Sequence, residues 1–284
     1  MTNQNKVAVV TGASRGIGKA IAVHLARAGF DVVVAARTVQ EGQVLEGLSL
    51  VPGSLEYTAS EIKALGRKAH VAKLDLLNKR DIENVVEQTI KEFGRIDVMV
   101  NNAARFGREG SRVFVDTPLE AYEKEIQANV LGPLYFAKLV VPIMTDQGGG
   151  IIMNVTSEAS RWDAVGVPLG YSMSKAGLSR QAQGLSKEFK ELNISIINVE
   201  PGLVASSQLP DEIMDAALHI DVPGAVCAYL ATHPHPMFFS GRVVDVPSFA
   251  VENKLVDGNT LPPLYGPEGW AMPERSPRPL NPWS

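Results

Sequence analysis

Residues 7–18 read Val-Ala-Val-Val-Thr-Gly-Ala-Ser-Arg-Gly-Ile-Gly and hold the strongest structural signal in the chain. A short apolar, β-branched run leads directly into three closely spaced glycines, Gly12, Gly16 and Gly18. Glycines at a turn from a strand to a helix let the backbone approach a pyrophosphate, and the start of the helix adds N–H donors and the positive end of its dipole. The segment therefore predicts the first strand–turn–helix unit of a nucleotide-binding fold. A merely tight turn between a strand and a helix is the alternative interpretation.

The rest of the chain repeats this alternation. Apolar runs typical of strands buried on both faces of a parallel sheet occur at 7–10, 31–36, 69–74, 96–100, 151–155, 195–199 and 242–246. Segments with helical spacing of apolar residues separate them. Gly29, Gly66 and Gly94 follow three of these helices, where a left-handed C-cap favours glycine. The alternation predicts a single α/β domain of Rossmann-like type, a doubly wound parallel sheet of about seven strands with right-handed crossovers.

The composition excludes several classes of protein. Of 284 residues, 45% are hydrophobic and 20% are charged, which provides ample apolar material for a folded core. The net charge of −4 argues against a nucleic-acid or anionic-membrane partner, because such binding needs a basic face. A single cysteine, Cys227, allows no internal disulfide, and no apolar run approaches the roughly 20 residues of a membrane span. Because strand-like residues follow a short polar start at once, we expect no signal peptide and a cytoplasmic protein.

The spacing Gly12-x3-Gly16-x-Gly18 differs from the G-x-G-x-x-G pattern of medium-chain dehydrogenases. It resembles the T-G-x-x-x-G-x-G motif of the short-chain dehydrogenase/reductase family. Two later motifs follow in the family's order. Residues 101–104, Asn-Asn-Ala-Ala, resemble N-N-A-G with alanine in place of the last glycine. Residues 201–206, Pro-Gly-Leu-Val-Ala-Ser, resemble P-G-x-V-x-T with serine in place of threonine, which keeps the hydroxyl group.

The resemblance extends over about residues 6–246 and implies a cofactor site. It implies one cofactor-binding catalytic domain over residues 1–250. A proline-rich extension over 251–284 follows, in which seven prolines lie between Pro262 and Pro282. Cofactor contacts are implied for Gly12, Ser14, Arg15, Gly16, Ile17, Gly18, Arg37, Asp75, Leu76, Asn102, Ala103, Tyr171, Lys175, Pro201, Gly202, Val204 and Ser206.

Individual contacts can be assigned by the same resemblance. Asp75 matches the acidic residue that contacts adenine, and the Val204 backbone and Ser206 hydroxyl match the groups that hold the nicotinamide carboxamide. For the cofactor's 2′ group, NAD-binding proteins place a carboxylate at the end of the second strand. Here that strand ends Val-Ala-Ala-Arg at 34–37, and both Arg37 and Arg15 can reach a 2′-phosphate. This pattern favours NADP(H). The alternative is that both arginines are solvated surface charges.

Tyr171 and Lys175 stand at i and i+4, on one face of the helix expected after the fifth strand. A tyrosine with a pKa near 10 exchanges protons slowly at neutral pH, and a neighbouring lysine charge lowers that pKa. Tyr171 is therefore the candidate acid/base, giving a proton to a carbonyl oxygen as hydride arrives, or removing it from an alcohol. In the family the lysine also binds the nicotinamide ribose.

Ser157 and Asn129 complete the catalytic set that the resemblance implies. Ser157 lies fourteen positions before Tyr171, one more than the commonest family spacing, and Glu158 stands at thirteen. We assign Ser157 as the partner of the substrate oxygen, with Ser160 in reserve; a serine that only caps its own backbone is the alternative. Asn129 matches an asparagine whose backbone carbonyl holds a relay water. Pro133, four residues later, has no N–H to donate to that carbonyl, although it could simply bend a surface helix.

Three loops at the carboxyl ends of the strands are expected to select the substrate: 105–117, 158–170 and 205–222. The third carries Leu209, Ile213, Met214 and Leu218, which indicate either a mobile apolar lid or a helix packed on the core. With Trp162 and Met173, it favours a partly apolar carbonyl or alcohol. The long insertion at 38–58 resembles that of hydroxysteroid-dehydrogenase-like members.

Several alternatives remain open at this level. A C=C or imine substrate would use the same residues, and a non-catalytic NADP(H)-binding regulatory protein would not need Tyr171 or Lys175. The five histidines show no metal-ligand spacing, so no metal is expected. Family members commonly assemble through the helices around Asn129 and Tyr171. Because both helices carry more apolar surface than one sheet face hides, we expect a homodimer or homotetramer, with the proline-rich tail packed at a pocket rim.

Overall fold

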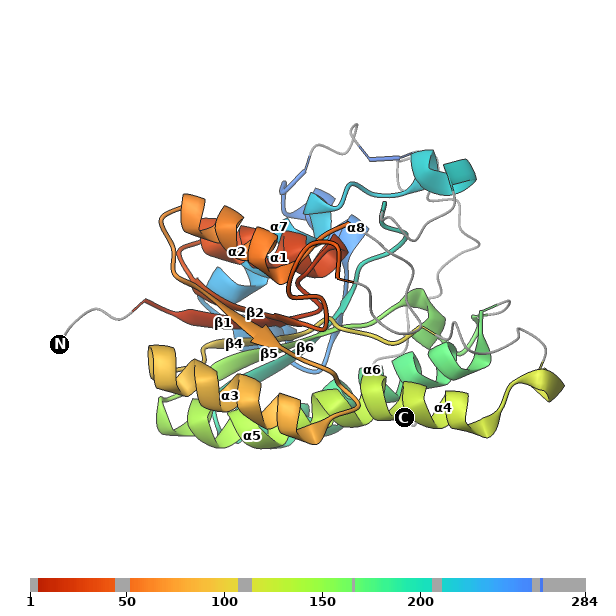
Figure 1. The fold of residues 1–284 in the computed structure, drawn as a ribbon, viewed down its shortest axis with the longest axis horizontal. Helices are drawn as coiled ribbons and strands as arrows, with labels where there is room; N and C mark the ends of the chain where they lie inside the picture. Colours follow the sequence, from red (N-terminus) through yellow and green to blue (C-terminus); the bar gives the residue numbers. More distant parts are fainter. Residues whose placement is uncertain are drawn as a thin grey trace.

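One parallel sheet of seven strands, in the order β3-β2-β1-β4-β5-β6-β7, runs through the molecule (Figure 1). The computed structural model describes residues 5–43, 52–106, 114–164, 167–205, 211–256 and 261–262. The strands are β1 (Val7–Thr11), β2 (Asp31–Ala36), β3 (Ala69–Lys73), β4 (Val98–Asn101), β5 (Gly150–Val155), β6 (Ile194–Glu200) and β7 (Val243–Asp245). The predicted doubly wound sheet is confirmed. β4 begins two residues later than predicted, and β7 ends early because Val246 begins a helix.

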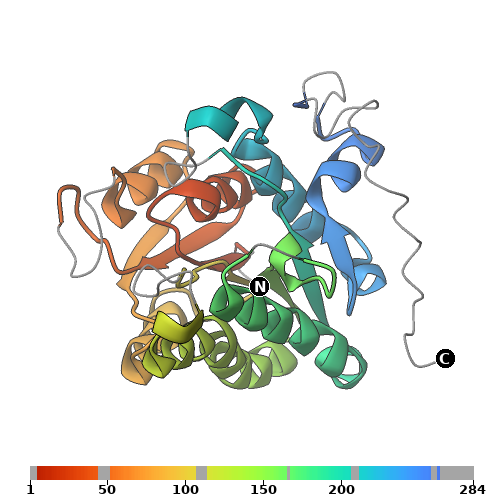
Figure 2. The same cartoon turned by 90° about the vertical axis from the view of Figure 1, so that its right-hand side faces the viewer.

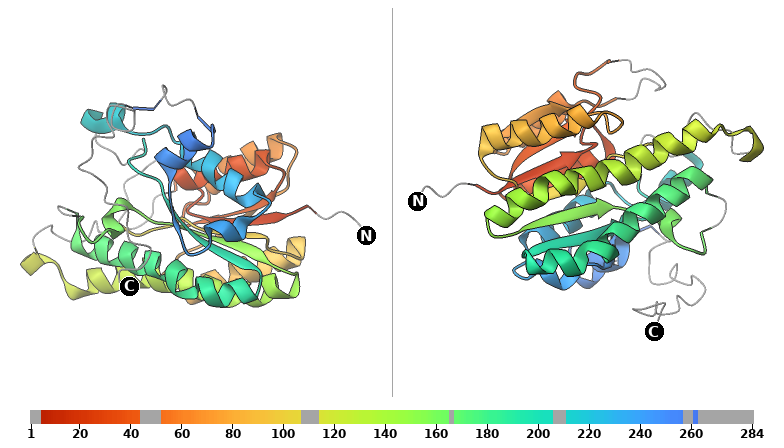
Figure 3. Two further views of the ribbon diagram at one scale, coloured as in Figure 1. Left: turned by 180° about the vertical axis from the view of Figure 1, so that it is seen from behind. Right: turned by 90° about the horizontal axis from the view of Figure 1, so that it is seen from below.

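Helices cover both faces of the sheet (Figures 1 and 3). One layer contains α1 (Gly16–Arg27), α2 (Leu55–Ala64), α7 (Asp221–Thr232) and α8 (Val246–Glu252). The other contains α3 (Lys79–Phe93), α4 (Leu119–Ile126), α5 (Gly132–Asp146) and α6 (Leu169–Glu191). The short helical turns are η1 (Phe114–Asp116), η2 (Gln127–Leu131), η3 (Glu158–Ser160), η4 (Asp211–Ala216) and η5 (Pro236–Phe239). Gly29, Gly66 and Gly94 have φ of 96°, 74° and 74°, as predicted for left-handed helix ends.

The core has two layers because side chains alternate across each strand. In β1, Ala8 and Val10 pack in the layer beneath α1 and α7, whereas Val7 and Val9 pack beneath α3 and α5. Each of these four side chains is at most 1% exposed. Burial on both faces explains why the strands appear in the sequence as continuous apolar runs.

A long helical run, Leu119–Asp146, passes through α4, η2 and α5. It is long and apolar enough to cross a membrane by length and composition alone. In the fold, however, it lies between α3 and α6 (Figure 3), and 44% of its most apolar window is buried. The run therefore serves as a core helix of this α/β fold.

The carboxyl ends of the strands meet at one edge, which faces the viewer in Figure 2. The parallel register pairs Asn101 with Asn154 and Val155 with Val199 at this edge. From β1 the chain adds β2 and β3 on one side, and it then crosses over to add β4 on the other side of β1. The switch point of the topology therefore lies between β1 and β4. Ligands of doubly wound folds bind in the crevice at such a point. At the other end of the chain, the predicted boundary between 250 and 251 falls inside α8, and 263–284 lie outside the described residues.

Candidate active site

The turn between β1 and α1 has the geometry of a phosphate cradle. Gly12 and Gly16 have φ of +70° and +60°, which side chains rarely adopt. A Cβ at Gly12 would lie 2.7 Å from Asn102 Nδ2, and one at Gly18 would lie 2.4 Å from the Gly12 carbonyl oxygen. Close packing therefore requires glycine at both positions. A Cβ at Gly16 would meet nothing within 4 Å, which leaves open space over the start of α1. No side chain caps α1, so its first N–H groups remain free to hold an anion.

The motif after β4 is bonded directly to this turn. The Thr11 hydroxyl donates to the Val100 carbonyl at 3.1 Å and accepts from the amides of Asn102 and Ala103, each at 3.0 Å. The Asn102 side chain donates back to the Thr11 carbonyl at 2.8 Å. Asn102 and Ala103 therefore fix the shape of the cradle from the other side of the switch point.

At the end of β2, Arg15 lies close enough to Arg37 for the Arg37 charge to act on its guanidinium group. The Arg15 guanidinium donates to the carbonyl oxygens of Gly53 at 2.9 Å and Pro52 at 3.2 Å. Burial lowers the pKa of Arg15, Glu41 opposes that effect, and Arg37 adds to it. Glu41, which the sequence analysis missed, also accepts from the Gly53 amide at 2.9 Å. Arg15 is thus held in place by the two ends of the insertion.

The predicted adenine contacts follow β3. The Asp75 carboxylate accepts from the Leu77 amide at 3.0 Å, and Leu76 is 8% exposed. A Cβ at Gly132 would lie 3.2 Å from the Leu76 side chain, so α5 begins against this loop.

Tyr171 and Lys175 lie on α6 as predicted, one turn apart. Lys175 is 3% exposed, and its Nζ donates to the Val155 carbonyl at 2.7 Å and lies 5.7 Å from the centroid of the Tyr171 ring. Burial lowers the pKa of Lys175 to about 8. For Tyr171, burial raises the pKa, a hydrogen bond with Ser157 lowers it, and the Glu125 carboxylate raises it further. The net effect is a rise, whereas the sequence argument expected Lys175 to lower this pKa; here the ammonium group turns to a carbonyl and burial dominates.

Ser157 lies next to Tyr171, and its hydroxyl also makes the backbone cap of the alternative interpretation. Its hydroxyl accepts from the Ala159 amide at 3.2 Å, which caps η3, and it also bonds Tyr171. Glu158, the residue at the commoner spacing, has its carboxylate 3.7 Å from Arg161. The one additional residue between Ser157 and Tyr171, relative to the commonest family spacing, is thus accommodated in the segment that begins with η3.

Asn129 lies in η2, a π-helical turn, and is 1% exposed. Because Pro133 cannot donate to the Asn129 carbonyl, an ordinary α-helical bond is impossible there, and the helix widens. The Asn129 side chain bonds both the amide and the carbonyl of Arg105, at 2.7 and 2.8 Å, and donates to Ser174 Oγ at 2.9 Å. It therefore connects the loop after β4 to α6. Pro133 was the sequence signal for this turn, but the contact with Ser174 had none.

The predicted nicotinamide end follows β6. Pro201 is buried, Gly202 has φ of +74°, and Val204 pairs with Leu218. This isolated bridge closes the predicted lid segment on itself, and the described part of the segment contains a 3₁₀ turn, η4, rather than a regular α-helix. Ser206 and Leu209 lie outside the described residues.

A buried ion-pair network next to this segment was not predicted. Glu200, the last residue of β6, is 1% exposed and bonds Arg161 of the loop after η3. Arg161 also lies 3.6 Å from Asp245 at the end of β7. Burial raises the pKa of Glu200, and Arg161 opposes that rise. The network joins three segments at the carboxyl edge.

An aromatic side chain of the loop after β4 packs against Tyr171. The Phe106 ring packs edge-on against the Tyr171 ring with centroids 4.9 Å apart. Trp162 is 94% exposed and Met173 is 47% exposed.

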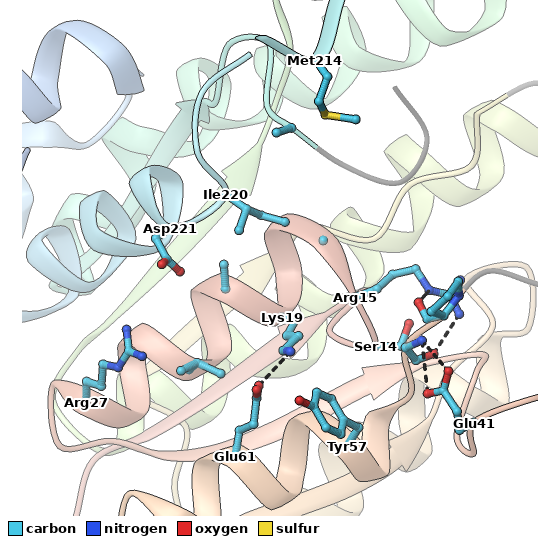
Figure 4. A pocket seen from close by; sticks show the side chains of 16 residues that line it. Ser14, Arg15, Lys19, Arg27, Glu41, Tyr57, Glu61, Met214, Ile220 and Asp221 are labelled. Carbon is cyan, nitrogen blue, oxygen red and sulfur yellow. Dashed lines mark hydrogen bonds and ion pairs between the residues drawn. The ribbon is translucent and has the colours of Figure 1, made fainter. Parts of the chain in front are cut away.

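A cavity of about 850 Å³ lies elsewhere, between α1, α2 and the segment before α7 (Figure 4). Its lining includes Arg15, Lys19, Tyr57 and Met214 but none of the four predicted catalytic residues. No cluster of metal ligands occurs among the described residues.

The chain belongs to the short-chain dehydrogenase family, whose sequence profile matches residues 6–218. Its fold and family define an oxidoreductase that uses a nicotinamide cofactor. It is 29% identical over 208 residues to the 7alpha-hydroxysteroid dehydrogenase of Escherichia coli strain K12, which covers 73% of this chain and 74% of that protein.

Two solved structures show the same fold with different cofactors. A 3-oxoacyl-[acyl-carrier protein] reductase from Brucella melitensis in complex with NAD superposes with a TM-score of 0.73 at 27% identity, over 86% of this chain and 96% of that one. A metagenomic short-chain oxidoreductase in complex with NADP superposes with a TM-score of 0.68 at 30% identity, over 84% and 95%.

Proposed function

We propose that this protein is an NADP(H)-dependent oxidoreductase that interconverts a carbonyl group and a secondary alcohol on a partly apolar small molecule. The observation that carries the proposal is that Ser157 bonds Tyr171 and Lys175 lies beside its ring, at the same edge of the sheet as the glycine cradle. When bound, the nicotinamide supplies or accepts the hydride. A protein that merely bound the cofactor would not need this arrangement.

The residues present fit a dinucleotide. The positive φ of Gly16, the open space above it and the uncapped start of α1 suit a pyrophosphate. The buried ammonium group of Lys175 suits the ribose, and the turn at Gly202 and Val204 suits the carboxamide.

The proton chemistry belongs to the side chains. During reduction, the Tyr171 hydroxyl donates its proton to the carbonyl oxygen, and the Ser157 hydroxyl donates a hydrogen bond to the same oxygen. In the oxidation of an alcohol, the Tyr171 phenolate takes the proton back. Lys175 lies one turn away, where its ammonium group is bonded to the Val155 carbonyl and is placed to hold the cofactor ribose. Asn129 holds the loop after β4 against α6 through its bonds to Arg105 and to Ser174, the residue before Lys175.

NADP(H) is the proposed cofactor because two arginines face the end of β2, where no carboxylate terminates the strand. The Arg15 and Arg37 charges repel each other, so an anion between them would relieve an unfavourable contact. Glu41 acts in the opposite sense, since it already offsets part of the Arg15 charge. The substrate is expected to be partly apolar because the Phe106 ring packs against Tyr171, and because Trp162 of the loop after η3 and Met173 of α6 are exposed.

The test is a panel of acetoin, 7-oxo steroids, 3-oxoacyl thioesters and the matching alcohols, followed by nicotinamide absorbance with NADPH and with NADH. Tyr171→Phe should lower kcat/KM on the best substrate by about 10²- to 10⁴-fold while leaving cofactor affinity nearly unchanged. Tyr229→Phe, on α7, is the matched control and should behave as the wild type. Cofactor binding without turnover of any compound would instead support a regulatory NADP(H)-binding protein. Full turnover by Tyr171→Phe would contradict the assigned acid/base.

A further inference from the structure

A buried carboxylate lies between α4 and α6, beside the catalytic pair. Glu125 is only 4% exposed, which is unusual for a charged side chain without a specific role. A Cβ built on Gly170 would lie 2.0 Å from Glu125 Oε2. Gly170 immediately precedes Tyr171 in the first turn of α6, so the carboxylate occupies the space where any larger residue would place its side chain.

The start of α6 lacks the usual sources of negative charge. Its N-cap residue is Pro168, which makes no side-chain capping bond, and the first turn contains no acidic residue. The first N–H groups of a helix have no partner inside it, and a nearby negative charge is favourable. Glu125 brings that charge to the first turn of α6 from the neighbouring helix.

Glu125 also stands in the same row of contacts as Asn129. The two residues are four positions apart and therefore share one face of the helical run. One turn beyond Gly170 on α6, Ser174 accepts a hydrogen bond from the Asn129 side chain at 2.9 Å. Glu125 thus contacts α6 at Gly170, before Tyr171, and Asn129 contacts it at Ser174, after Tyr171. Together they fix the position of this turn of α6 along the helical run.

Among the described residues, the polar and charged groups that act on the Tyr171 side chain come from three segments of the chain. Lys175 lies on α6 itself, Ser157 immediately precedes η3, and Glu125 lies on α4. Phe106, after β4, contributes an apolar ring. Ser157 lowers the pKa of Tyr171 and Glu125 raises it, in addition to the larger rise that burial causes.

We propose that Glu125 is a positioning residue of the active site, whose carboxylate holds the first turn of α6 and thereby places the Tyr171 side chain. The negative charge of Glu125 acts in the same sense as burial and favours the protonated form of the Tyr171 hydroxyl, the form that donates a proton during reduction. This inference rests on the proposed function of Tyr171 as the acid/base.

The test is Glu125→Gln, which keeps the shape of the side chain and removes its charge. The Tyr171 phenol should then titrate roughly one pH unit lower. This midpoint is measured without turnover, as the near-ultraviolet phenolate signal of each protein minus that of the same protein carrying Tyr171→Phe. In alcohol oxidation with NADP⁺, the rising limb of kcat against pH should move down by the same amount, with little change in KM. The matched control is Glu123→Gln on the exposed side of α4, which should leave the midpoint in place.

An unchanged midpoint in Glu125→Gln, or equal shifts in both glutamine variants, would overturn the proposal. If Glu125→Gln does not fold, Gly170→Ala provides the second test, because its Cβ displaces the carboxylate without removing it. It should shift the midpoint in the same direction, and no shift would again overturn the proposal. Retention of full activity by Tyr171→Phe would refute the acid/base assignment instead, while the phenolate titration would still report on Glu125.

Discussion

Two arginines at the end of β2 govern the proposed choice of cofactor. Arg37→Asp should weaken NADPH binding by about ten- to a hundred-fold and improve the relative affinity for NADH. The physical reason is that the variant replaces a cation by an anion next to the 2′-phosphate. Titration calorimetry with both cofactors measures this, and Arg180→Asp on the exposed side of α6 serves as the control. Equal affinity of the wild type for NADPH and NADH would contradict NADP(H) specificity.

The protonation of Lys175 should make the binding of the cofactor depend on pH. Burial lowers its pKa to about 8, so the side chain is an ammonium ion below that pH and a neutral amine above it. Because a dinucleotide is an anion and its ribose accepts hydrogen bonds, binding favours the ammonium form. The dissociation constant of NADPH should therefore rise as pH increases through 8. In Lys175→Gln this rise should disappear; the same pH dependence in that variant would assign the effect to another group.

At the scale of elements, the Arg161–Glu200 pair joins the loop after η3 to the end of β6. Glu200→Leu should lower the free energy of unfolding by about 3–5 kcal/mol, because it leaves the Arg161 charge poorly compensated. Adding Arg161→Leu should restore much of that loss. Urea unfolding measures both. Glu87→Gln, which breaks an exposed pair with Arg80, is the control and should leave the unfolding midpoint unchanged. Simple additivity of the two leucine substitutions would show that the pair is not coupled.

The elements differ in how far the sequence predicts them. The strands are predictable because burial on both faces leaves continuous apolar runs, and the β1–α1 turn because its glycines are required by φ and by close packing. Pro133 indicates the irregular helix around Asn129, since the missing N–H is a local property. In contrast, Arg161 and Glu200 are 39 positions apart, and the contact between Glu125 and Gly170 joins two different helices, α4 and α6. Such contacts depend on tertiary packing, which leaves no periodic or local signal.

At the scale of the whole molecule, the topology gathers these parts at one edge. The strands that flank the switch point supply the cradle, and β5 and β6 supply Ser157 and Glu200. The helical run α4–η2–α5 and α6 then form one outer layer that carries Asn129, Glu125 and Tyr171 (Figure 3). A contact that covers this layer would therefore also brace the catalytic residues.

The same outer layer exposes apolar side chains, from which we expect the protein to form a homodimer or homotetramer. Leu178, Ala182 and Phe189 of α6 are at most 5% exposed in the single chain, so they need no partner. Leu119 and Leu131, by contrast, are 67% and 44% exposed on the α4–α5 run. Symmetric contact between two copies is the commonest way to bury such a surplus. Light scattering at micromolar concentration should give two or four times 30.6 kDa.

The substitution Leu131→Glu should reduce that mass toward a single chain, because it places a charge in the proposed contact. It should also lower turnover if the contact braces the Asn129 turn. Leu65→Glu at the end of α2 places the same charge at a residue of similar exposure, 42%, outside this layer, and should leave the mass unchanged. A wild-type mass of 30.6 kDa would rule out the assembly at that concentration. Equal effects of the two glutamate variants would show that the α4–α5 run is not the contact surface.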